Sequence, residues 1–165
     1  MGRPVDACWL IQINLLSSTF VRLIDIIDCA KERPMKLPHD FKRIRLNLAR
    51  SKQFPNGSVR HGYEFVAPLD AKGHIDTKLW HQHRDHCRVR RFWDGRGDEI
   101  GLLVHKPGGA EHARWVFDYD ASTTDDDESG YRFGSHAFAP GEYVSISEQD
   151  GDLHTFKVLS VEAAT

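Results

Sequence analysis

The chain of 165 residues has few cysteines and no long apolar segment. Its three cysteines, Cys8, Cys29 and Cys87, are odd in number and widely spaced, which excludes a disulfide framework and a paired-cysteine metal knuckle. We therefore expect a reducing, cytoplasmic environment. Charged residues at positions 22, 25 and 28 interrupt the N-terminal apolar stretch, so no membrane-spanning helix is expected there and no membrane partner is predicted.

The sequence also lacks the short motifs that carry common catalytic chemistry. There is no Gly-x-Ser-x-Gly elbow, no phosphate-binding glycine loop and no His-Glu-x-x-His helix. Cys87 follows His86, but neighbouring residues on a strand point to opposite faces, so this imidazole would not activate the thiol there. These absences favour a non-catalytic protein over an enzyme.

What the sequence does contain is charge, distributed unevenly along the chain. Residues 36–96 carry 14 Lys+Arg against 6 Asp+Glu, a local net charge of +8. Residues 97–165 carry 4 against 14, a local net charge of −10. A basic half attracts anions, and a basic face on one copy suits an acidic face on another. The charge distribution therefore gives information about binding partners and not about the fold.

Apolar and polar residues alternate with a period of two over most of the chain after residue 41, which is typical of half-buried strands. Turn-forming Asn, Asp, Gly and Pro residues separate the segments 41–48, 59–68, 88–93, 100–105, 115–119, 143–147 and 156–161. We predict a mainly β fold, a small antiparallel barrel or bent sandwich of seven to eight short strands. A short helix is expected over residues 76–83, with Asp76 as its N-cap and Trp80 facing inward.

The N-terminal residues follow a helical rhythm instead. Between residues 13 and 27 the apolar side chains recur at helical spacing, with polar residues on the opposite side. We predict an amphipathic helical extension over residues 1–34, followed by a single β domain over 35–165. The extension would cover its own domain, or would dock on a partner or a second copy. Met35 is an alternative start of the natural product.

The predicted core collects the apolar residues of the strands. Both Tyr143 and Val144 are included, so a bulge or two-sided burial is expected there. The predicted core residues are Ile44, Leu46, Leu48, Phe65, Leu102, Val104, Trp115, Phe117, Tyr143, Val144, Ile146, Phe156, Val158 and Val161.

The basic half mixes arginines with aromatic residues. Guanidinium groups neutralise phosphates and exposed rings stack on unpaired bases, so the mixture suits an oligonucleotide or another polyanion. An acidic protein surface or a second copy of the chain are the other partners considered. The predicted ligand-binding residues are Arg43, Arg45, Arg60, Tyr63, Trp80, Arg88, Arg90, Trp93, Arg132 and His136.

A second hypothesis is a metal-dependent enzyme that acts on small molecules. His81, His83, His86 and Cys87 form the densest cluster of metal-ligand types, although their spacing matches no established zinc pattern. Acidic residues at 118, 120 and 125–128 begin like a calcium loop but lack its glycine and its final glutamate. We expect no bound cofactor, with zinc or calcium as the alternatives.

Two resemblances accompany these patterns. Residues 140–146 (PGEYVSI) resemble a strand of flavin-binding barrels of the ferredoxin reductase family, but the flavin-gripping segment of that family has no counterpart here. The segments 87–92, 103–105 and 130–134, with the final hairpin, are similar to small proteobacterial β-domain proteins of unknown activity. This resemblance implies one compact β domain and no particular ligand.

Overall fold

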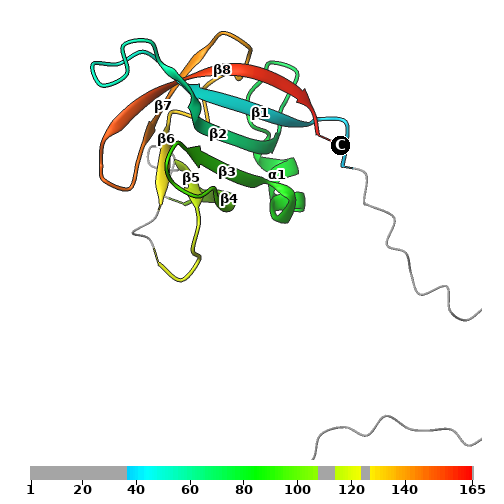
Figure 1. The fold of residues 1–165 in the computed structure, drawn as a ribbon. Helices are drawn as coiled ribbons and strands as arrows, with labels where there is room; N and C mark the ends of the chain where they lie inside the picture. The colour runs from blue at the N-terminus through cyan, green and yellow to red at the C-terminus, as the bar shows by residue number, and fades with distance from the viewer. Residues whose placement is uncertain (1–36, 108–113, 124–126, 165) are drawn as a thin grey trace, which may run out of the picture. The chain divides into compact units, whose positions relative to one another are not determined.

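The computed structural model describes residues 37–107, 114–123 and 127–164, and these residues form a closed antiparallel β-barrel (Figure 1). Each strand pairs with the next in sequence, and β8 pairs with β1 to close the barrel. The barrel alternative of the predicted fold is thereby confirmed over a sandwich. The strands are β1 (Phe41–Leu48), β2 (Ser58–Pro68), β3 (Arg88–Trp93), β4 (Glu99–Lys106), β5 (Arg114–Asp118), β6 (Glu128–Tyr131), β7 (Tyr143–Ser147) and β8 (Leu153–Ala163).

Aromatic rings fill the barrel interior. Tyr63 and Phe65 on β2 lie against Phe117 on β5, with ring centroids 5.1 and 5.3 Å apart, and Tyr63 also meets Phe156 at 4.9 Å. All four side chains are at most 1% exposed. Burial of each ring contributes roughly 1.5–3 kcal/mol, and paired rings add about 0.5–1.5 kcal/mol. The interior is therefore a packed core.

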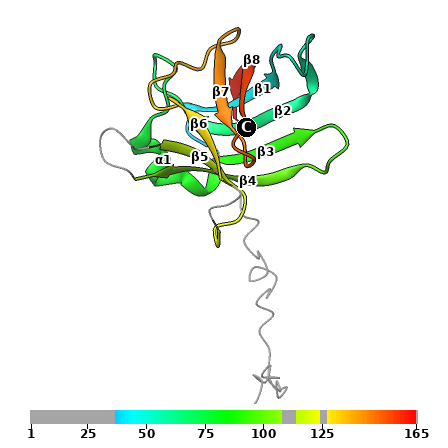
Figure 2. The ribbon, with the colours of Figure 1, turned by 90° about the vertical axis from the view of Figure 1, so that its left-hand side faces the viewer.

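The predicted short helix is confirmed as α1 (Thr77–His83), which lies between β2 and β3 along the chain. The Asp76 carboxylate accepts hydrogen bonds from the backbone N–H groups of residues 78 and 79 at 2.8 and 3.1 Å, as an N-cap does. Trp80 faces inward, and its indole N–H donates to the Leu103 carbonyl at 2.9 Å. The 3₁₀ turn η1 (Arg84–His86) follows. In both views α1 lies at the end of the barrel opposite the β1–β2 loop (Figure 2).

A close approach between strands explains Gly62 on the outer face of β2. A Cβ atom there would lie 2.0 Å from the Leu46 carbonyl oxygen and 2.9 Å from the ring of Phe92. Gly62 is paired with Phe92 in the sheet register, so that ring covers the space where a side chain is missing. Only glycine fits this position.

Four of the predicted core residues are not buried. Tyr143 is 56% exposed and Leu102 36% exposed, while Val104 and Val161 are half-buried. Val144 and Ile146 point into the barrel, so the alternation of a regular strand turns Tyr143 outward. Because Tyr143 faces outward, the strand needs no bulge at this position, and the prediction that Tyr143 belongs to the core is wrong.

The predicted amphipathic helix within residues 1–34 lies outside the described residues. Within the described part of the chain, no helix has the length and apolar character needed to cross a membrane.

Candidate functional site

The predicted basic residues of β1 and β3 lie on the outer face of the barrel. Arg88 and Arg90 alternate with the buried Val89 and Arg91, and Arg43 and Arg45 alternate with buried residues of β1. In the sheet register Arg45 is opposite Glu64, and Glu64 is opposite Arg90. We call this surface, made of Arg43, Arg45, Glu64, Arg88, Arg90 and Phe92, the β1–β3 face.

Acidic neighbours neutralise much of the β1–β3 face. The Glu64 carboxylate lies 3.6 Å from a guanidinium nitrogen of Arg45 and 3.6 Å from one of Arg90. Arg90 also donates to Asp98 at 3.0 Å. At the end of β2, Arg60 pairs with Asp94 at 3.1 Å. Arg45, Arg60 and Arg90 are thus paired with acidic residues on or beside adjacent strands, whereas Arg43 and Arg88 form no ion pair within the described residues.

The aromatic residues of the basic half are not available for stacking on a base. Tyr63 and Trp80 are 0% and 4% exposed, and Phe92 is 8% exposed. The guanidinium groups of Arg45 and Arg90 lie 4.8 and 5.5 Å from the Phe92 ring centre, where they cover it. Tyr63 and Trp80 are two of the predicted ligand-binding residues, and their burial contradicts a role for either ring in stacking on a base.

Trp93 is the last residue of β3 and is half-buried, and the Arg91 guanidinium lies 4.6 Å from the centre of its ring. The remaining two predicted ligand residues lie in the β6–β7 loop. Arg132 is exposed, and its carbonyl accepts hydrogen bonds from the N–H groups of Ser135 and His136, both at 3.0 Å. This loop packs beside the β2–α1 connection, where the Phe138 N–H donates to the Gly73 carbonyl at 2.8 Å. The ten predicted residues therefore do not share one surface.

The predicted metal cluster is spread over α1, η1 and the residue that precedes β3. Cys87 is fully buried, and its thiol makes only a long contact of 3.8 Å with the His83 carbonyl. Burial raises the pKa of Cys87 to about 12, so the thiol is protonated near neutral pH. Across residues 37–107, 114–123 and 127–164, no three His, Cys, Asp or Glu side chains are arranged to hold a metal ion.

The acidic residues considered as an alternative calcium site lie in two different environments. Asp120 uses its carboxylate to cap its own turn, accepting from the Ser122 N–H at 2.9 Å. Glu128 points into the barrel and is 0% exposed. Residues 124–126 lie outside the described residues.

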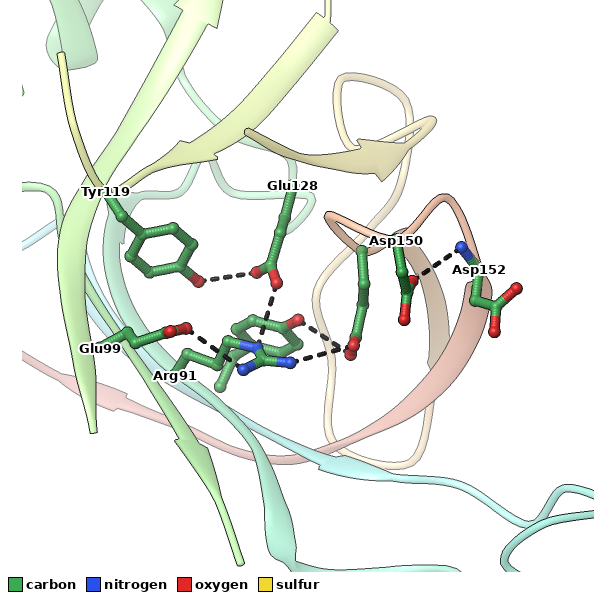
Figure 3. Close-up of polar contacts among 8 residues, drawn as sticks. Arg91, Glu99, Tyr119, Glu128, Asp150 and Asp152 are labelled. Carbon is green, nitrogen blue, oxygen red and sulfur yellow. Dashed lines mark hydrogen bonds and ion pairs between the residues drawn. The ribbon is translucent and has the colours of Figure 1, made fainter. Parts of the chain in front are cut away.

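The interior of the barrel contains a charged cluster that no sequence motif indicates (Figure 3). Arg91 contacts three carboxylates: Glu128 at 3.1 Å, Glu148 at 3.0 Å and Glu99 at 3.2 Å. The Tyr119 hydroxyl donates to Glu128 at 2.7 Å, and the Tyr63 hydroxyl to Glu148 at 3.2 Å. We call these six residues the Arg91 cluster. Its residues come from β2, β3, β4 and β6 and from the positions that directly follow β5 and β7.

Burial is the main cause of the pKa shifts of Glu128, Tyr63 and Tyr119 in the Arg91 cluster. Burial raises the pKa of Glu128 to about 7, although the Tyr119 hydroxyl and the Arg91 guanidinium oppose this shift. Burial also raises the pKa of Tyr63 and of Tyr119, so both phenols remain protonated donors. Arg91, Glu128 and Glu148 are 5%, 0% and 7% exposed. These three side chains are closed to solvent, and their ion pairs join β3, β6 and the residue that follows β7 inside the barrel.

A groove on the outer wall formed by β7, β8 and the adjoining ends of β1 and β2 has different chemistry. It has a volume of about 510 Å³ and runs between the β1–β2 loop and the outer surface of β7 and β8. Three large apolar side chains are exposed along it: Val59 at 72%, Tyr143 at 56% and Leu159 at 45%. We call it the Tyr143 groove. It is lined by Asn47, Leu48, Ala49, Arg50, Asn56, Gly57, Ser58, Val59, Tyr143, Thr155, Lys157 and Leu159.

The cations of the Tyr143 groove are unpaired. Arg50 and Lys157 are exposed, and neither has an ion-pair or hydrogen-bond partner for its side chain among the residues that the structure describes. Among the described residues, no Asp or Glu lines the groove. The buried Asn47 contributes a side-chain oxygen that has no hydrogen-bond partner within the described residues. The Asn47 oxygen is closed to solvent, so the groove itself offers positive charge and an open aromatic ring.

A second groove, of about 650 Å³, lies beside α1 and crosses β4. Its exposed apolar residues are Ile100 and Leu102, and its charged residues have both signs, including Arg88 and Asp85. The mixture of signs gives it no preference for an anion, in contrast with the Tyr143 groove.

Sequence reasoning missed Tyr143 and Lys157 as surface residues. One signal was present: Lys157 lies between the apolar Phe156 and Val158, so alternation alone turns it outward. The pairing of Lys157 with both Tyr143 on β7 and Asn47 on β1 depends on register, which no local pattern shows.

Comparisons of the chain with protein-family models, with curated proteins and with solved structures find no match in any of the three.

Proposed function

We propose that this chain is a non-catalytic module that binds an anionic partner in the Tyr143 groove. The observation that carries the proposal is a pair of exposed cations, Arg50 and Lys157, which have no ion-pair partner and no acidic neighbour in the groove among the residues that the structure describes. An anion that enters meets positive charge without displacing an internal partner. Its binding is therefore not offset by the loss of an existing ion pair.

The β1–β3 face supports this function less well. Arg45 and Arg90 share Glu64, and both cover Phe92, so an anion would compete with contacts that are already formed. Exposed ion pairs of this kind are individually weak, about 0–1 kcal/mol, but together they reduce the positive potential that would attract a partner.

The test measures heparin affinity by titration calorimetry in buffers from 50 to about 300 mM salt, since ionic binding of a polyanion weakens with salt. The variant R50Q/K157Q removes both cations of the groove. We expect its affinity to fall about tenfold, from two exposed charge contacts of roughly 0.7 kcal/mol each.

The matched control is R43Q/R88Q, which removes the same charge from the β1–β3 face. Arg43 and Arg88 are both exposed, so neither substitution disturbs the core. We expect this control to lose less than about threefold in affinity, because only overall charge changes. An equal loss in both variants, or heparin binding that does not change with salt, would contradict the proposal.

A further inference from the structure

We infer that the partner is a single-stranded nucleic acid, with an unpaired base stacked on the Tyr143 ring and the flanking phosphates held by Arg50 and Lys157. The inference rests on the proposed function of the groove and names the chemistry of its occupant. An acidic protein segment is the rival occupant that the experiment must separate.

Position along the sheet brings the ring and the cations together. Tyr143 on β7 is opposite Lys157 on β8, and Lys157 is opposite Asn47 on β1. These three side chains form one row across the outer wall, with neighbouring strands about 4.8 Å apart. The Ala49 N–H donates to the Thr155 carbonyl at 2.8 Å, which fixes the start of the β1–β2 loop, and with it Arg50, beside β8.

The combination of groups favours a nucleotide over a peptide carboxylate. Each unit of a single strand carries one phosphate and one flat aromatic base, and the groove presents unpaired cations and an open aromatic ring side by side. An acidic peptide would use the cations and leave the Tyr143 ring without a matching group. Base stacking on a tyrosine is also tolerant of sequence, because every base has a π face.

Size and apolar lining agree with this occupant. About 510 Å³ lies within the range of sites for small ligands. Val59 and Leu159 provide apolar surface next to the ring, against which a base or sugar edge can pack. In a duplex the base faces are already stacked, so the groove selects single strands.

The experiment measures fluorescence anisotropy of a dye-labelled ten-residue oligodeoxythymidine with the full chain, and uses heparin and polyglutamate as anions without bases. Tyr143→Leu removes the ring and keeps an apolar side chain, whereas Tyr143→Phe keeps the ring. We expect Y143L to bind the oligonucleotide about tenfold more weakly and Y143F to bind within about twofold of the unaltered chain. Heparin affinity should be unchanged in both, because heparin offers no base.

The salt dependence gives a second readout. Two phosphate contacts on a single strand predict a slope of about −1.4 for the logarithm of affinity against the logarithm of salt concentration. The R50Q/K157Q variant should lose most of this slope. Because Tyr143 is 56% exposed, its substitution should leave the thermal unfolding temperature nearly unchanged, and this is checked by circular dichroism.

The outcomes separate the two proposals. If R50Q/K157Q weakens heparin binding but Y143L binds the oligonucleotide as tightly as the unaltered chain, the groove takes anions without stacking, and only this inference is overturned. Tighter binding of polyglutamate than of the oligonucleotide also overturns it, in favour of an acidic protein partner. If R50Q/K157Q behaves like R43Q/R88Q toward every probe, both the inference and the proposed function fail.

Discussion

The β1–β3 face and the Tyr143 groove both contain cations beside an aromatic ring, but the two arginines over the ring of the β1–β3 face are paired and the two cations of the groove are not, among the described residues. On the β1–β3 face, Arg45 and Arg90 contact Glu64 and cover Phe92. In the groove, Tyr143 is exposed, and Arg50 and Lys157 have no partner among the described residues. The difference teaches that the density of basic residues along a chain does not locate a binding surface. The acidic residues that folding brings beside them decide it.

The largest effect is expected from Arg91→Met, which removes the cation of the Arg91 cluster inside the barrel. The substitution leaves Glu128 and Glu148 buried without a counter-charge, and we expect it to lower the free energy of unfolding by about 3–5 kcal/mol. Arg90→Met, one residue along the same strand but on the outer face, should cost less than about 1 kcal/mol. Urea unfolding followed by tryptophan fluorescence measures both. Equal losses would mean that inward and outward pairing contribute alike.

A smaller effect is expected from the proton on Glu128. The pKa of Glu128 is about 7 in the folded barrel and about 4.5 as an ordinary carboxyl, so the folded state holds this proton more tightly. Its contribution to stability is complete below about pH 4.5 and is lost as the pH rises to about 7. The difference in unfolding free energy between the unaltered chain and Glu128→Gln should therefore change by on the order of 1–3 kcal/mol between pH 4.5 and pH 8.

The comparison variant isolates this proton, because Gln cannot titrate. Stability curves for the two proteins that stay parallel across this pH range would show that Glu128 is ionised throughout in the folded state.

The smallest effect should come from changing the β1–β3 face into an unpaired surface. Glu64→Gln removes the carboxylate shared by Arg45 and Arg90 and keeps its shape. We expect heparin affinity to rise about two- to threefold, with a change in stability below about 1 kcal/mol. Calorimetric titration measures the gain. An unchanged affinity would show that pairing with Glu64 does not limit anion binding to the β1–β3 face.

Local patterns predicted much of the fold. Alternation in residues 41–48 and 143–147 marked strands, and Asp76 followed by a short apolar-faced segment marked α1. The same patterns failed at Tyr143, which was assigned to the core because it is apolar and adjacent to Val144. The candidate site could be predicted only in kind, as cations near an aromatic ring. Its residues could not be named, because Arg50, Tyr143 and Lys157 come from three separate segments.

The sequence by itself determined the periodicity of the strands, the capped helix and the excess of arginine in the first half of the barrel, since these depend on neighbours along the chain. Only the tertiary structure decided that β8 closes on β1, that Glu64 and Asp98 pair with Arg90 of β3, and that Arg91 contacts Glu128 and Glu148 inside the barrel. The physical reason is that electrostatic energy depends on distance in space, and strand register sets that distance between residues far apart in sequence.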